Sequence, residues 1–520
     1  MAGATAPAVD PAGADSWTLI PANRRALAGV VLALSNFMVV LDLTIANVSV
    51  PHISGDIGVS MDQGTWIVTS YAVAEAICVP LTGWLAQRFG AVRVFILSVA
   101  GFGLFSVLCG LSVSLGMLVA ARIGQGLCGG PIMPMSQTLL IRVFPPERRP
   151  MALGLWAMTI TAGPALGPLI GGVISDEATW HWIFFINIPV AIVCVVSGIA
   201  LLRPVETPVR KVPIDRIGLA LMVLWIGCLQ VMLDIGRDRD WFADTQVIVL
   251  AVVGLVGFIA FVIWELTDEH PIVDIRVLRH RGFTLAVIAQ STAFGAFFAG
   301  AVVVPQYLQT TLGYSATKSG MVSGAHAFLA ILMSRLVVGL VSKVDSRLLV
   351  SVGMVGLAMT ALLRSQWTSD APMSVLLWGM MSQGLAVMFF MIPLTTMALS
   401  AVKPEETATA SGLQNFLRTV AVAVSTSLVL TMWSNFQTEA RAGLAGRLND
   451  QPARATLAGL GMNAQQATAF IEQTLQREVV TIGIDRVFQV AAALMVFAAM
   501  LVWMVPKPPK PGSQAPAGGH

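Results

Sequence analysis

The chain has 520 residues, of which 56% are hydrophobic and only 11% charged, and its formal net charge is +3. Apolar runs of about 20 residues with few charges are typical of membrane-spanning helices, since a helix satisfies its own backbone hydrogen bonds in lipid. This composition excludes a water-soluble globular protein, and the runs are too long and uniform for barrel strands. All five cysteines lie inside apolar runs, which argues against a disulfide or metal framework.

Fourteen apolar segments are predicted to span a membrane as helices. They lie at residues 26–48, 65–86, 91–112, 116–141, 151–174, 180–202, 215–234, 246–266, 283–305, 317–341, 348–367, 372–398, 407–432 and 485–505. The Ala-, Pro- and Gly-rich stretches 1–23 and 506–520 are expected to be disordered cytoplasmic tails. Most connections are short, but 433–484 is long and of mixed polarity.

Positive charge fixes the predicted direction of the helices. With the amino terminus inside, the inner segments hold nineteen Lys and Arg residues, whereas the short outer loops hold only Arg237, Arg239, Lys318 and Arg364. Because Lys and Arg favour the cytoplasmic side, both termini are expected in the cytoplasm and 433–484 outside.

A repeat divides the chain into two halves. GWLAQRFGAVRV (83–94) follows the second span, and GLVSKVDSRLLV (339–350) follows the tenth, each with a glycine and then clustered charge. Two halves related by an axis along the membrane normal are typical of secondary transporters. We expect an all-α polytopic fold with an N-terminal six-helix bundle at 24–202, two inserted helices at 203–281 and a C-terminal six-helix bundle at 282–505.

Three ionisable residues of the first half are candidate functional groups, because charge inside a membrane is costly. At 1.5 Å per residue, Asp42 lies about 24 Å from the cytoplasmic start of its helix and Arg122 about 9 Å from the external start of its own, so the two can meet. Glu75 lies near the midplane. We assign Asp42 and Glu75 as proton carriers and Arg122 as their switchable partner. A static Asp42–Arg122 strut, and a structural or cation-binding Glu75, remain the alternatives.

The second half contributes weaker candidates. Arg418, deep in the thirteenth span, and His326 in the tenth are candidate substrate contacts, although structural pairing and packing explain them equally simply. Arg335 lies near the cytoplasmic end of its helix, where a long side chain reaches the interface.

Residues 154–172, GLWAMTITAGPALGPLIGG, concentrate glycine and proline in an apolar helix. Gly163, Gly167 and Gly171 are four residues apart, so they share one helix face and allow another backbone to approach closely.

Six stretches in order resemble the fourteen-helix drug:proton antiporters of the EmrB/QacA type, within the major facilitator superfamily. They are LDLTIANVSVP (41–51), GWLAQRFGAVR (83–93), LVAARIGQGLCGG (118–130), the 154–172 stretch, WHWIFFINIP (180–189) and SGLQNFLRTV (411–420). The resemblance covers nearly the whole chain and implies the major facilitator fold.

The resemblance also implies two gating regions. The antiporter motif of the fifth helix comprises Gly154, Gly163, Gly167, Pro168, Gly171 and Gly172. It is expected to form a contact between the halves near the external side, with ordinary small-residue packing as the alternative. The cytoplasmic gate comprises Gly83, Arg88, Gly90 and Arg93, with Asp345 and Arg347 as second-half equivalents. Gln87 stands where the family commonly has Asp, which weakens the expected pairing of the arginines with the facing bundle.

The implied function is proton-driven export of hydrophobic, amphipathic or cationic toxic compounds across a cell inner membrane. Such an exporter is not an enzyme and needs no cofactor, metal or nucleic acid, and the chain lacks a GxxxxGK[ST] phosphate-binding motif. A dedicated exporter of one metabolite, siderophore or antibiotic, and a non-transporting sensor or scaffold, are the alternatives.

The resemblance to EmrB-type exporters implies a periplasmic membrane-fusion adaptor and an outer-membrane channel as partners. In 433–484, ARAGLAGRL and AQQATAFIEQTLQREVV place apolar residues at helical spacing. We predict one or two short amphipathic helices there that cap the external mouth or dock the adaptor. A tolerated insertion over lipid headgroups is the alternative.

Overall fold

The computed structural model describes residues 16–506 apart from 211–212, 237–238, 270, 342, 404–405 and 446–449. The described chain is almost entirely helical, and each of the fourteen predicted spans coincides with one helix or with two helices across a short break. The spans formed by one helix are α1 (Ala22–Ile57), α4 (Ala91–Gly110), α7 (Arg149–Glu177), α10 (Arg216–Ile235), α11 (Thr245–Thr267), α12 (Arg281–Thr310), α13 (Ala316–Val341), α14 (Ser346–Arg364), α15 (Met373–Ser400), α16 (Thr407–Ala445) and α18 (Ala464–Val502).

Three spans are broken. The second consists of α2 (Met61–Cys78) and α3 (Thr82–Phe89), which meet at 58°. The fourth consists of α5 (Leu115–Gly129) and α6 (Ile132–Val143), and the sixth of α8 (Trp182–Phe185) and α9 (Asn187–Leu202). Pro80 and Pro131 lie at the first two breaks, where proline removes a backbone donor and interrupts the helical hydrogen-bond ladder.

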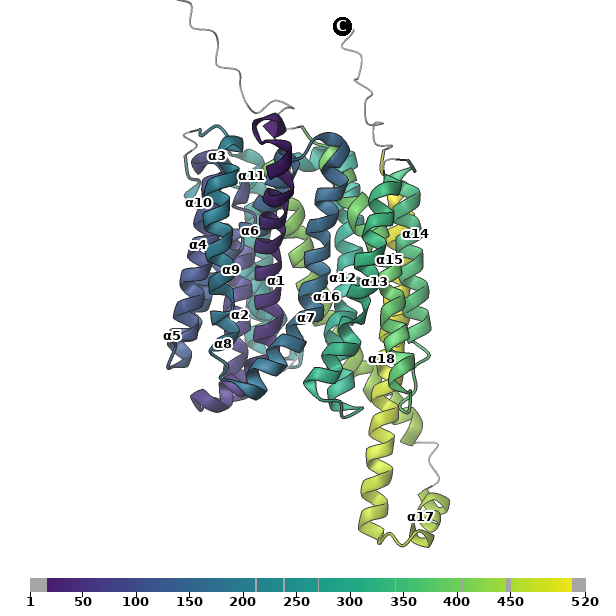
Figure 1. The fold of residues 1–520 in the computed structure, drawn as a ribbon. Helices are drawn as coiled ribbons and strands as arrows, with labels where there is room; N and C mark the ends of the chain where they lie inside the picture. Colours follow the sequence, from purple (N-terminus) through teal and green to yellow (C-terminus); the bar gives the residue numbers. More distant parts are fainter. Residues whose placement is uncertain are drawn as a thin grey trace, which may run out of the picture.

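The helices form two bundles that lie side by side (Figure 1). The first six spans pack on one another, as α1 does on α7 and α2 on α5, and the last six do so through α12, α14, α15, α16 and α18. Contacts of α7 with α13 and α15, and of α16 with α3 and α6, join the bundles. The inserted helix α10 packs on α11, α2 and α16. The predicted all-helical membrane fold is confirmed.

The first described residues are ordered, although a disordered tail was expected up to residue 23. A 3₁₀ helix covers Ser16–Leu19, and Ser16 Oγ donates to the Arg142 carbonyl at 3.1 Å. Ile20 is buried, and its carbonyl accepts a 2.9 Å hydrogen bond from Arg25 Nε. The expectation was therefore wrong from Ser16 onward, because the side chain of Ile20 joins the core. Residues 1–15 and 507–520, where the rest of the predicted tails falls, lie outside the described residues.

The segment 433–484 is largely helical, as its spacing predicts, but it is built differently. Its ends are continuations of α16 and α18, and a short helix, α17 (Asp450–Gly459), lies between them. Helices of 39 residues are about 58 Å long, against a hydrocarbon core of about 30 Å. The expected cap over the mouth is corrected to a hairpin that projects from the C-terminal half (Figure 1). Ion pairs of Arg441 with Glu472 and of Arg486 with Glu439 join its arms.

Candidate functional site

A buried ion pair lies at the centre of the N-terminal half. Arg122 Nη1 of α5 is 2.7 Å from Asp42 Oδ2 of α1, and the two side chains are 0% and 1% exposed. The estimate of equal depth along two antiparallel helices therefore identified a real contact. Around it, Leu41, Ile67 and Phe184 belong to a separate apolar cluster, so the pair is shielded from water.

Neutral side chains complete the shell of Asp42. Its Oδ1 accepts hydrogen bonds from Gln125 Nε2 at 3.1 Å and Asn187 Nδ2 at 2.7 Å. Both amides also donate to Ser106 Oγ of α4, at 2.8 and 3.0 Å. Gln125 and Asn187 lie within the quoted stretches 118–130 and 180–189, but their types are too common in helices to have suggested a role.

Arg122 is held on its other side by α2. Its Nε donates to the Ile67 carbonyl at 3.0 Å, and its guanidinium lies 4.2 Å from the Tyr71 ring centre. Arg122 Nη2 is buried and has no hydrogen-bond partner among the described residues. A proton on Asp42 would remove the charge that holds Arg122, so protonation and the position of the guanidinium are physically linked.

Glu75 lies one turn beyond Tyr71 on α2 and is 6% exposed. The charged side chains that act on its carboxyl are those of Arg418, Arg122 and Asp42. At its level α2 packs tightly on α5, since a Cβ at Gly130 would lie 3.0 Å from the Glu75 carbonyl oxygen. The carboxyl is thus buried, and α16 of the opposite half also contacts α2.

Arg418 of α16 extends from the C-terminal half into the N-terminal half. Its Nη2 lies 3.3 Å from Met133 Sδ of α6, and its guanidinium is 5.5 Å from the Trp156 ring of α7. The Phe294 ring of α12 is 5.2 Å away on its own side. The side chain is 6% exposed, so it faces protein, as the sequence predicts.

The other charged candidates differ in how exposed their side chains are. His326 of α13 is buried, with Nδ1 2.7 Å from its own helix at the Ser323 carbonyl and its ring 5.8 Å from that of Phe297. Arg335 is exposed, as expected. Arg364, expected in an outer loop, is buried in α14 with its guanidinium 4.6 Å from the Phe488 ring. The outer-loop assignment was wrong because the helix extends to this residue.

The glycine stripe of α7 packs against α1. A Cβ at Gly163 would lie 2.9 Å from Val40 Cβ, and one at Gly167 would lie 2.6 Å from Thr44 Cβ. Gly171 faces Ile45 at 3.3 Å. Because α1 belongs to the same half, the expected contact between the halves is wrong for these three glycines, although the close backbone approach is confirmed.

The opposite face of α7 meets the C-terminal half. At one end a Cβ at Gly154 would lie 3.1 Å from Val338 of α13 and from Ile392 of α15. At the other end a Cβ at Gly320 of α13 would lie 3.0 Å from the Leu169 amide nitrogen. Gly172 is buried, and the side chain of Pro168 lies outside what the structure describes.

The comparisons with known proteins agree with this arrangement. The model of the Major Facilitator Superfamily matches residues 32–426. The chain belongs to the major facilitator superfamily. It is 40% identical over 498 residues to the multidrug export protein EmrB of Escherichia coli K12, a match that covers 94% of this chain and 97% of that one.

A second relative and one solved structure extend the comparison. This major facilitator is 38% identical over 507 residues to the fatty acid resistance protein FarB of Neisseria gonorrhoeae, covering 96% of this chain and 99% of FarB. The crystal structure of the human organic anion transporter MFSD10 (TETRAN) aligns with a TM-score of 0.58 at 14% identity, over 93% of this chain and all of that one. The structural likeness shows the fold alone.

The contact between α16 of one half and α3 and α6 of the other is made by small and neutral residues in this major facilitator. A Cβ at Gly83 of α3 would lie 2.8 Å from Thr409 Oγ1 and 3.0 Å from Thr409 Cα of α16. Deeper along α16, Ser411 Oγ and Asn415 Nδ2 donate to Gln137 Oε1 of α6 at 2.8 and 2.7 Å. Sequence reasoning placed Gly83 in this gate but missed the amides.

The turn between α3 and α4 is held by a carboxylate from beyond α9. Glu206 accepts hydrogen bonds from the amides of Val92 at 2.8 Å and Arg93 at 3.1 Å, at the start of α4. Gly90 has φ +91°, and a Cβ there would lie 2.6 Å from Glu206 Oε1, so glycine is required. Arg93 Nε is 4.0 Å from Glu206, not beside the facing bundle as expected, because this nearer carboxylate occupies the helix N-terminus.

The remaining gate residues are less constrained. Arg88 is half-buried near the end of α3. In the second half, Asp345 caps α14 by accepting from the Arg347 amide at 3.0 Å. The two turns are therefore both anchored by a carboxylate at a helix N-terminus, Glu206 in one and Asp345 in the other.

The end of the inserted segment is tied to the C-terminal half outside the spans. Arg279 and His280 contact Glu406 at 2.9 and 3.0 Å. Partial burial alone would raise the pKa of Glu406, but hydrogen bonds from the Lys403 amide and His280, with the charge of Arg279, hold that pKa below its usual value.

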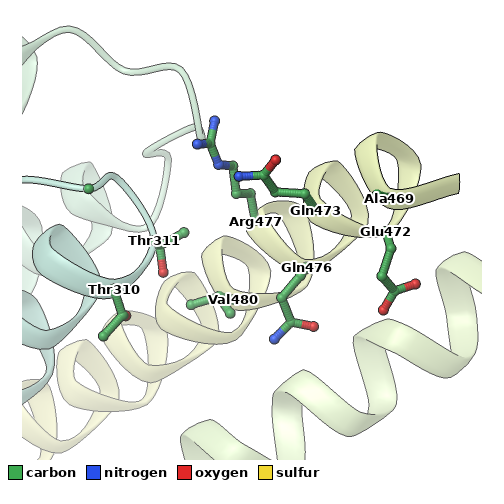
Figure 2. A pocket seen from close by; sticks show the side chains of 9 residues that line it. Thr310, Thr311, Ala469, Glu472, Gln473, Gln476, Arg477 and Val480 are labelled. Carbon is green, nitrogen blue, oxygen red and sulfur yellow. The ribbon is translucent and has the colours of Figure 1, made fainter. Parts of the chain in front are cut away.

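A pocket of about 760 Å³ opens at the base of the α16–α18 hairpin (Figure 2). It is lined by Thr310, Thr311 and Gly313 at the end of α12, and by Ala469, Glu472, Gln473, Gln476, Arg477 and Val480 of α18. It is remote in sequence from the buried charges. No group of three or more His, Cys, Asp and Glu in the described part of the chain is arranged to hold a metal ion.

Proposed function

We propose that this protein is a proton-coupled antiporter that exports hydrophobic and amphipathic toxic compounds, a multidrug exporter of the cell inner membrane. The proposal is supported by its similarity to the multidrug export protein EmrB over nearly the whole length of both chains. The name of FarB, a fatty acid resistance protein, is consistent with amphipathic substrates.

The buried Asp42–Arg122 pair carries the proposal for proton coupling. Asp42 either pairs with Arg122 or holds a proton, and the two states differ by one charge in a water-free environment. A change of that kind favours different positions of α1, α2 and α5, which supply the pair and its contacts. Proton binding from one side and release to the other would therefore be linked to the alternation of the halves.

Substrates are proposed to bind between the halves, where Glu75 and Arg418 lie. Glu75 would attract cationic compounds, while Arg418 offers a guanidinium flanked by the rings of Trp156 and Phe294. His326 of α13 lies beside Phe297, which is one turn beyond Phe294 on α12. It is the outermost candidate of this group. No cofactor is needed, because the proton gradient supplies the driving force.

The proposed topology places both termini in the cytoplasm and the α16–α18 hairpin in the periplasm. This follows from the excess of Lys and Arg in the inner loops. The correction for Arg364 increases that asymmetry. A periplasmic adaptor and an outer-membrane channel would then receive the substrate, with the hairpin as the docking element.

Transport in inside-out vesicles tests the proposal. Vesicles containing the protein, energised by respiration, should accumulate several compounds of a dye panel and release protons from their lumen upon addition of each transported dye. A collapsed proton gradient should abolish accumulation. Vesicles that accumulate dye without proton movement would contradict the coupling, and vesicles that move one compound alone would favour a dedicated exporter.

A further inference from the structure

Two buried, oppositely charged side chains from different halves approach each other without a direct ion pair. Arg418 hydrogen-bonds to Met133 Sδ alone among the described residues, and it otherwise lies between the rings of Trp156 and Phe294. Glu75 makes no hydrogen bond or ion pair with a described side chain. Each charge is therefore left without a fixed partner in its own half.

The packing of α16 on α2 places Glu75 and Arg418 at a similar depth along the two helices. A Cβ at Gly412 of α16 would lie 3.5 Å from the Val79 carbonyl oxygen, just past the end of α2. The helices run in opposite directions. Glu75 precedes Val79 by four residues and Arg418 follows Gly412 by six, so they lie about 6 and 9 Å further out along their axes.

Two cations act on Glu75, Arg418 and Arg122. Arg122 is already engaged by Asp42 at 2.7 Å, so Arg418 is the cation available to respond to Glu75.

The other groups around Glu75 do not replace Arg418. The element α1 contributes Asp42, α5 contributes Arg122 and Cys128, and α2 itself contributes Tyr71 and Cys78. From α10, Asp234 is hydrogen-bonded to Thr69 near the external end of α2. Arg418 is thus the cation that reaches Glu75 from the opposite half, and it alone changes distance when the halves move.

We propose that Arg418 is a positioning residue for proton coupling, which acts across the interface between the halves to set the charge of Glu75. With Arg418 beside it, Glu75 is a carboxylate and its proton has left to the water of the open side. When the halves separate at this level, Arg418 withdraws and Glu75 takes up a proton. The inference rests on the proposed proton-coupled export and assigns this step to one residue.

Infrared difference spectroscopy of the purified full-length protein tests the pair without any substrate. The protonated carboxyl band that disappears in Glu75→Gln is assigned to Glu75, and its intensity is followed against pH. In Arg418→Met the midpoint of this band should move up by about one pH unit, because loss of a nearby cation favours the protonated form. Arg418→Lys should restore the midpoint, and Arg335→Met, which removes an exposed arginine, should leave it unchanged.

Two further variants separate electrostatics from packing. Arg418→Gln keeps a polar side chain and should shift the midpoint as Arg418→Met does. It replaces the methionine variant if that variant folds poorly. The pH profile of vesicle transport should move upward with Arg418→Met and stay unchanged with Arg335→Met. An unchanged midpoint in both charge-removing variants would overturn the inference. Wild-type vesicles without proton movement would overturn the proposed function instead.

Discussion

Asp42 is surrounded by three donors from two helices. Arg122 and Gln125 come from α5 and Asn187 from α9, and all three donate to the two carboxylate oxygens. Charge-assisted hydrogen bonds of this kind are stronger than neutral ones, and the shell is arranged for an anion. Removal of the negative charge therefore alters two properties at once, the capacity to hold a proton and the neutralisation of Arg122.

Asp42→Asn is expected to abolish substrate-driven proton release while the protein still inserts into the membrane. Loss of the charge also leaves Arg122 buried and unpaired, which should cost about 3–5 kcal/mol of stability. Proton release is measured in vesicles with a pH-sensitive dye, and stability by thermal unfolding in detergent. Asn187→Ala is the matched control, because it removes one neutral donor at about 1 kcal/mol and keeps the acid. Unchanged antiport in Asp42→Asn would remove Asp42 from the mechanism.

At this scale the sequence identified the charged residues and missed the neutral ones. Asp42 and Arg122 were predictable because each charge is costly in a membrane and their depths follow from the rise of a helix. Gln125, Asn187 and Gln137 were not, because an amide in an apolar helix has many uses and only the packing shows which atoms it meets. Arg364 was misplaced because its charge was assigned to an outer loop although it lies inside the predicted span 348–367.

Elements pack through contacts that a single methyl group would disturb. On α7 the three stripe glycines face α1, but the available space differs along the stripe. The Cβ position at Gly167 overlaps Thr44, whereas that at Gly171 lies 3.3 Å from Ile45, a tight contact that a shift of a few tenths of an ångström relieves. The stripe therefore contains a more sensitive and a less sensitive site of the same residue type.

Gly167→Ala should lower the thermal stability by about 1–3 kcal/mol and reduce export, because the added methyl group pushes α1 away from α7. Gly171→Ala, on the same face one turn away, should lower both properties less, because the overlap is smaller and the helical preference of alanine offsets part of its cost. Export and melting temperature are compared for the two variants at equal expression. Equal behaviour of the pair would refute the packing argument.

Glu206→Ala should destabilise the α3–α4 turn by about 1–2 kcal/mol, because two amides at the start of α4 lose their acceptor. Export should fall as well, since α3 carries Gly83 against Thr409 at the cytoplasmic contact. Transport rate and melting temperature are the measurements. Glu147→Ala removes an exposed carboxylate on the same side and should have no effect. A silent Glu206→Ala variant would exclude this carboxylate from the gate.

The sequence pattern of apolar residues predicted which helices exist, but it did not predict which helices pack on one another. All fourteen spans follow from runs of apolar residues, and two of the three breaks coincide with Pro80 and Pro131. The partner of the glycine stripe is α1 and not the other half, because glycine spacing shows that a helix approaches without saying which one. Glu206 was missed because it lies far in sequence from the α3–α4 turn that it holds. The chain has the uncharged Gln87 close to that turn, at the position where the family commonly has Asp.

On the scale of the whole molecule, the protein consists of two helical bundles and one projecting hairpin. The bundles meet through α7 with α13 and through α16 with α3 and α6, so both ends of the interface contain close contacts. The hairpin takes no part in these contacts and extends beyond the C-terminal half (Figure 1). Its position keeps it apart from the contacts through which the bundles meet.

The hairpin carries large apolar side chains where no membrane covers them. Leu460 is 73% exposed and Phe470 48% exposed, beyond the length that the bilayer core accommodates. Exposed apolar groups on a projecting element are typical of a protein interface. Replacing 440–475 by a Gly/Ser linker, or changing Leu460 and Phe470 to serine, should therefore leave dye transport in inner-membrane vesicles intact but lower whole-cell resistance and adaptor cross-linking. Val113→Ser alters an 86% exposed residue on the other half and should affect neither. Full resistance with the linker in place would make the hairpin a tolerated insertion, because delivery would then proceed without it.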